Sequence, residues 1–166
     1  MSIKTSLILA SFLLVLGVPS ANAQSSGDAV MNEKQLQAAK ELVETERNMQ
    51  LIINLEFSPE QNEKFWPLYE EYRQKVRSVR ERKLSLIQSY AERYWAGTVD
   101  DEFAEMAIKD LLKIQLETVK IRQKYWKKFR RILPATKAAR FYQLENKMDA
   151  EVDYVLAGGV PLVESS

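Results

Sequence analysis

Hydrophobic residues beyond residue 30 recur every three or four positions, and no segment shows sustained alternation of apolar and polar residues. This spacing is typical of one face of an α-helix, whereas alternation is typical of a strand. Capping residues, Pro and Gly mark the breaks between four predicted helices. Their expected ranges are 31–55, 59–96, 99–133 and 134–157. We therefore predict an all-α fold.

The second predicted helix has a distinct start. Ser58 can cap it, Pro59 suits its first position, and Gln61 completes a capping box three residues after the cap. An apolar seam with spacings of three, four and seven follows, which is typical of a coiled coil. Its members are Phe65, Tyr69, Tyr72, Val76, Val79, Leu86 and Tyr90. We expect Pro67, inside this pattern, to kink the helix.

The third predicted helix carries two apolar rows, and Thr98 is its expected N-cap. The first row consists of Ala107, Leu111, Ile114, Thr118, Ile121, Tyr125 and Ile132. The second row consists of Leu112, Leu116, Val119 and Trp126. Because the second row widens the apolar face, we expect this helix to contact more than one partner.

Only Gly97 and Thr98 separate the second helix from the third. At 1.5 Å per residue these helices are about 57 and 52 Å long, so we expect them to fold back as an antiparallel hairpin. The turn places residue 80 near residue 117 and residue 73 near residue 124. The hairpin is too thin to bury a wide apolar face alone, so flanking helices or a second copy must cover it, and we expect a homodimer.

The first 23 residues have the features of a secretory signal peptide. Lys4 supplies a positive charge, residues 7–18 form an apolar run, and Ala21-Asn22-Ala23 is a pattern that signal peptidase recognises. As a helix this run spans about 18 Å, which is too short for a bilayer core of about 30 Å. We expect cleavage after Ala23, export and no stable membrane insertion.

The length of 166 residues predicts one domain, or at most two small ones. We expect a flexible mature N-terminus over residues 24–30, a single helical domain over residues 31–157 and a C-terminal tail over residues 158–166.

The chain contains no Cys and no His. Their absence excludes disulfides, thiol catalysis, zinc sites built from Cys and His, and Ser-His catalytic triads. Carboxylate pairs remain, but the acidic runs at residues 70–71 and 100–102 are adjacent residues that point to different sides of a helix. We therefore predict that the protein is not an enzyme, and we expect no catalytic residue, no cofactor and no metal site.

Basic residues cluster in two stretches that the hairpin brings together. Residues 73–93 hold seven Lys and Arg against two Glu, and residues 113–140 hold ten against one. The basic candidates for a binding surface are Arg73, Arg77, Arg80, Lys83, Lys120, Arg122 and Lys124. Trp66 and Trp95 are further candidates, because packing in the apolar seam explains their positions less well than it explains those of the seam aromatics. Charge runs are usually solvated faces, so the alternatives are a solvated face, a surface for polyanions or acidic proteins, and a surface for anionic membranes. Nucleic acid is not an expected partner of an exported protein.

The segment Phe57-Ser58-Pro59-Glu60-Gln61 resembles the LTxxQ motif of the Spy/CpxP family of bacterial periplasmic proteins. Gln61 matches the motif, Ser58 replaces the Thr with the same capping hydroxyl, and Phe57 replaces the Leu. Residues 65–72 are also similar to extensions in this family. A second copy at residues 133–137 has Lys137 where Gln is expected. The resemblance covers about residues 55–150.

This resemblance implies an all-helical chain with a long hairpin, assembled as a cradle-shaped antiparallel dimer. It also implies an ATP-independent chaperone that holds unfolded or misfolded envelope proteins, which we call clients. The alternative that it implies is a stress-response regulator or scaffold that binds one specific partner, such as the sensor domain of a kinase. A chaperone acts on several unrelated clients, whereas a regulator ignores them.

Overall fold

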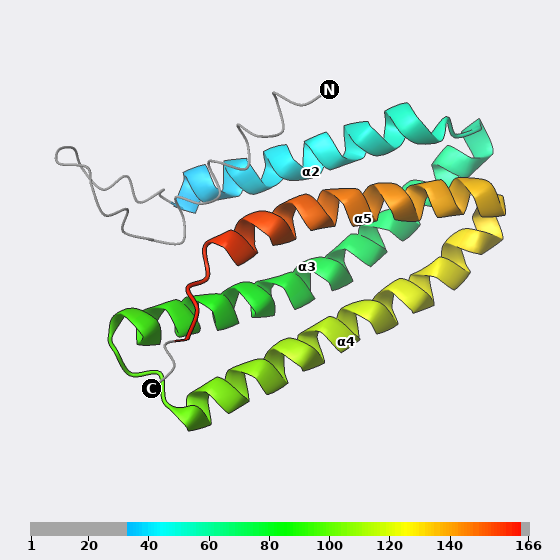
Figure 1. Ribbon diagram of the computed structural model, residues 1–166. Helices are drawn as coiled ribbons and strands as arrows, with labels where there is room; N and C mark the ends of the chain where they lie inside the picture. The colour runs from blue at the N-terminus through cyan, green and yellow to red at the C-terminus, as the bar shows by residue number, and fades with distance from the viewer. Residues whose placement is uncertain (1–32, 164–166) are drawn as a thin grey trace. The chain divides into compact units, whose positions relative to one another are not determined.

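The computed structural model describes residues 33–163, which form four helices and no strand (Figure 1). The helices are α2 (Glu33–Leu55), α3 (Pro59–Trp95), α4 (Asp101–Ile132) and α5 (Ala135–Gly158). The predicted all-α class is confirmed. The predicted signal peptide and mature N-terminus lie outside the described residues. None of the helices described is both long and apolar enough to cross a membrane.

The described residues group into two compact units. The first holds α2 up to Asn54 together with Gln143–Gly159, and the second holds Leu55–Tyr142 together with the residues from Val160. Helix α5 therefore contributes its first turns to the second unit and its remainder to the first. The sequence had predicted one helical domain over residues 31–157.

The first unit is held by a buried ion-pair cluster. Arg47 of α2 donates to Glu145 at 3.1 Å and to Asp149 at 2.9 Å, both in α5. All three side chains are almost completely buried. Two carboxylates facing one guanidinium compensate a charge that would otherwise be costly to bury. The partners are separated by about one hundred residues of sequence.

The second unit is built on a cluster of aromatic rings from α3, α4 and the first turns of α5. Phe65 of α3 lies 5.4 Å from Phe129 of α4 and 5.3 Å from Phe141 of α5, measured between ring centroids. Tyr72 and Tyr125 pack beside them, with centroids 5.4 Å apart. All five residues are buried. Five members of the seam predicted for the second helix are therefore buried in this unit, namely Phe65, Tyr69, Tyr72, Val76 and Val79, whereas Leu86 and Tyr90 are half-buried.

Helices α3 and α4 pack side by side and run in opposite directions (Figure 1). Arg82 pairs with Glu117 at 2.5 Å near the middle, and Glu71 pairs with Lys128 at 2.9 Å toward the other end. Gly97 lies in the turn with φ of +65°, a conformation that glycine adopts without steric cost.

The capping residues fix the helix starts. Ser58 Oγ accepts from the Gln61 backbone N at 3.3 Å, and Gln61 Oε1 accepts from the Ser58 backbone N at 3.2 Å, so both bonds of the capping box are made. The expected cap of α4, Thr98, was wrong. Asp100 caps this helix by accepting from the Phe103 backbone N at 2.8 Å. Both residue types can cap, and a carboxylate also favours the positive end of the helix.

Candidate functional site

The outer face of α4 carries an exposed row of large apolar side chains. We call this the apolar row: Ile108, Leu112, Leu116, Val119 and Trp126. The first four are between 47 and 58% exposed, and Trp126 is 37% exposed. At 100° per residue they occupy a sector of about 80°, well away from the buried side of the helix. The row runs about 27 Å along α4.

Basic side chains occupy the adjacent sector of the same helix. We call this the basic strip: Lys109, Lys113, Lys120, Lys124, Lys127 and Arg131. All six are exposed and fall within about 60° of one another around the helix axis. Helix α4 therefore has three faces: a buried face, an apolar face and a basic face. An exposed row of large apolar side chains beside a row of charge is typical of an interaction site.

The strip is neutralised at its beginning but not at its end. Lys109 pairs with Glu105 at 2.6 Å, and Lys113 pairs with Asp110 at 2.8 Å. By contrast, three basic residues form no ion pair with any residue that the structure describes. These are Lys120, Lys127 and Arg131. They border an open hollow of about 460 Å³ together with Gln123, Lys124 and Lys128.

One edge of α4 is fixed to α3 by a hydrogen-bond network. The Tyr125 hydroxyl donates to Glu71 at 2.7 Å, and Lys128 Nζ donates to the same carboxylate at 2.9 Å. The bonds from Lys128 and Tyr125 lower the pKa of Glu71. Burial, followed by the bond to Glu71, raises the pKa of Tyr125 to about 12. The network holds the core face of α4 inward, so the apolar row stays outward.

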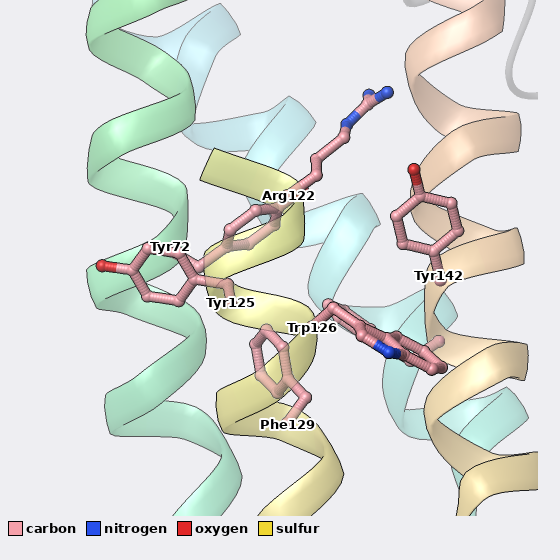
Figure 2. Close-up of a pocket in the computed structure, with 7 residues that line it drawn as sticks. Tyr72, Arg122, Tyr125, Trp126, Phe129 and Tyr142 are labelled. Atoms are coloured by element: carbon pink, nitrogen blue, oxygen red, sulfur yellow. The ribbon is translucent and has the colours of Figure 1, made fainter. Parts of the chain in front are cut away.

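The apolar row ends beside an aromatic niche between α3, α4 and α5 (Figure 2). Trp126 extends toward Tyr142 of α5, with ring centroids 6.4 Å apart, while the side chain of Arg122 extends away from the rings. The niche is also lined by Tyr72, Tyr125, Phe129 and Phe141. It encloses about 10 Å³, which is room for one water molecule at most. It is therefore a packed end to the row and not a pocket for a ligand.

The basic residues predicted from the sequence do not form one exposed band. Lys120 and Lys124 lie in the exposed basic strip. Arg73 is buried, with 2% exposed, and does not present its guanidinium to solvent. The others are half-buried; they are Arg77, Arg80, Lys83 and Arg122. Arg77 pairs with Glu70.

The predicted tryptophans lie in different surroundings. Trp66 is half-buried within the aromatic cluster, where its Nε1 donates to Asn62 at 2.8 Å. Trp95 is 57% exposed at the end of α3. In the motif, Phe57 packs against Phe65 at 4.4 Å. Gln61 also accepts a bond from Lys137 at 2.9 Å. The motif therefore joins the start of α3 to the start of α5.

Sequence reasoning missed Ile108 of the apolar row and four members of the basic strip. The missed strip residues are Lys109, Lys113, Lys127 and Arg131. The charges had been counted by stretches of sequence, which mixes the faces of a helix. Sorting the third predicted helix by its 3.6-residue period would have separated the strip from Arg122.

The chemistry available on α4 is that of binding. Apolar side chains favour burial against another apolar surface, and neighbouring ammonium groups attract carboxylates. No group of three or more acidic side chains suited to a metal ion occurs in residues 33–163. Comparison with protein-family models, with curated proteins and with solved structures finds no match to this chain.

Proposed function

We propose that the protein is a periplasmic, ATP-independent, chaperone-like binding protein that holds unfolded or misfolded envelope proteins on the outer face of α4. The single observation that carries this proposal is the apolar row beside the basic strip. Four of the five apolar side chains are about half exposed, although each could have been polar at no cost to the core. Such a surface gives unfolded chains apolar contact together with charge attraction.

The features of the sequence support the remaining parts of the proposal. The signal peptide supports export, and the lack of Cys and His supports binding without catalysis, cofactor or metal. The resemblance of residues 57–61 to the LTxxQ motif supports a cradle-shaped homodimer. In this proposal the core residues of α3 keep α4 straight, and binding and release need no nucleotide.

Aggregation suppression tests the proposal. Two unrelated client proteins are unfolded and diluted into buffer without ATP, and light scattering is followed with and without the purified protein. We expect the protein to reduce scattering of both clients at near-stoichiometric amounts. If the protein suppresses the aggregation of neither client, the proposal is contradicted.

The alternative function is that of a regulator or scaffold that binds one folded partner, such as a sensor kinase domain. The breadth of binding separates the two functions, because a regulator leaves both unrelated clients to aggregate. The chaperone function is favoured here because the apolar row forms a ridge on one helix, and the aromatic niche at its end holds no more than a water molecule. A ridge can accept many different chains.

A further inference from the structure

The charges along α4 are strongly polarised. Residues 101–117 hold five acidic and two basic side chains, a net charge of −3, whereas residues 118–132 hold seven basic side chains and no acidic one, a net charge of +7. Basic residues are favourable near the C-terminus of a helix because they oppose the helix dipole, but this effect accounts only for the basic residues in the last turn of α4. The positive half extends over about four turns and contains the basic strip residues Lys120, Lys124, Lys127 and Arg131.

The geometry of the apolar row suits a helical partner. Its members follow one another by four, four, three and seven residues, which corresponds to steps of about 6, 6, 4.5 and 10.5 Å along the axis. A second helix with apolar residues at i, i+4, i+8, i+11 and i+18, or at the same spacings in reverse order when it runs antiparallel, repeats these steps and can contact the row along its length. An extended chain places same-side residues about 6.6 Å apart, so it follows Leu112, Leu116 and Trp126 to within about 1.2 Å but misses Val119 by about 3 Å.

We propose that this surface selects amphipathic helical segments that are acidic in one half, and that their acidic half lies over residues 120–131 of α4. Acidic residues are commonest near the N-terminus of helices, where they oppose the helix dipole. Such a segment docks antiparallel to α4, because a parallel orientation would place its acidic half over the acidic half of α4. This inference rests on the proposed function and names the class of client segment.

Two peptides of about 20 residues test the orientation. Both carry the same apolar row and the same composition, are stapled to equal helicity and bear a donor fluorophore at the N-terminus. One has four Glu in its N-terminal half and the other has them in its C-terminal half. Because the chain has no Cys, Gln74→Cys and Glu92→Cys, at exposed positions of α3, each give a single site for an acceptor dye outside the binding face. These two sites lie about 27 Å apart along α3, and the antiparallel packing places Gln74 beside the basic half of α4 and Glu92 beside its acidic half.

We expect energy transfer from the N-terminally acidic peptide to be stronger to the dye at position 74. For the C-terminally acidic peptide we expect stronger transfer to the dye at position 92. Lys120→Gln/Lys124→Gln should weaken binding of both peptides by about tenfold. The matched variant Lys75→Gln/Lys147→Gln, which removes two exposed lysines from other helices, should leave binding unchanged. The same order of transfer for both peptides overturns the proposal.

Two further readouts separate this inference from its alternatives. If phosphatidylglycerol vesicles bind the protein and displace both peptides irrespective of their charge order, the face belongs to a lipid surface and the proposal is overturned. If clients are protected from aggregation but the peptides show no preferred orientation, the proposed function stands and this inference fails. If the orientation is observed without client protection, this inference stands and the chaperone function fails.

Discussion

Arg47 is the single residue on which the first unit depends most. Its guanidinium meets the carboxylates of Glu145 and Asp149, and all three groups are buried. Removing the arginine leaves two buried negative charges side by side, so we expect Arg47→Ala to lower the free energy of unfolding by about 3–5 kcal/mol. Arg82→Ala, which removes an exposed pair with Glu117, should cost no more than about 1 kcal/mol. Urea denaturation of the two variants measures both values, and equal losses would contradict this assignment.

Tyr125 makes the stability of the second unit depend on alkaline pH. Its pKa of about 12 in the folded protein lies above the ordinary value of about 10, so the folded state holds the proton more tightly than the unfolded state does. The resulting stabilisation is complete below pH 10 and is lost as the pH rises from 10 to 12. We expect Tyr125→Phe to lose less stability than the wild type between pH 9 and pH 11. Urea denaturation measures this loss for both proteins. If the denaturation midpoints of the variant and the wild type fell equally between pH 9 and pH 11, Tyr125 would not be the source of the pH dependence.

At the scale of the elements, the end of α2 carries a strained residue. Glu56 follows the last residue of α2 with φ of +45°, in the left-handed region that favours glycine. Its carbonyl oxygen accepts a bond from Lys137, which a change of side chain leaves in place. We expect Glu56→Gly to raise the free energy of unfolding by about 1 kcal/mol, whereas Glu56→Ala should give no gain. A thermal melt of both variants tests this, and equal melting temperatures would contradict it.

The elements were the part of the structure that the sequence predicted best. Ser58, Pro59 and Gly97 mark helix ends by local chemistry alone, so their roles could be read without knowledge of the fold. The choice of Asp100 over Thr98 as the N-cap of α4 could not be read in this way. Both residue types can cap a helix, and because they lie two positions apart each would accept from different backbone N–H groups.

Tertiary features were predicted less well, because they depend on residues far apart in the chain. The Arg47 cluster joins residues about one hundred positions apart, and no local pattern indicates it. Periodicity predicted that Leu112, Leu116 and Val119 share a face, but it does not say what covers that face. Counting charges along stretches of sequence placed Arg73 among the basic residues of a surface, although its side chain is buried.

At the scale of the whole molecule, charge separation predicts a strong effect of salt on client capture. Raising the salt from about 0.05 to 0.5 M shortens the Debye length about threefold and screens attraction by the basic strip. We expect the association rate of an acidic client to fall with salt while its dissociation rate changes little. Stopped-flow fluorescence measures both rates. Lys120→Gln/Lys124→Gln should show a flatter salt dependence, and an association rate independent of salt would contradict the role of the strip.

The central claim is that the apolar row on α4 holds clients, and one comparison of variants tests it most directly. Leu112→Gln/Leu116→Gln removes two exposed side chains from the row, and Leu42→Gln/Met49→Gln removes two similarly exposed side chains from α2. Both variants should stay helical by circular dichroism, because neither pair lies in the core. In the aggregation assay with two unrelated clients, we predict that the α4 variant loses most of its protection and the α2 variant keeps it. Full protection by a folded α4 variant would contradict the claim.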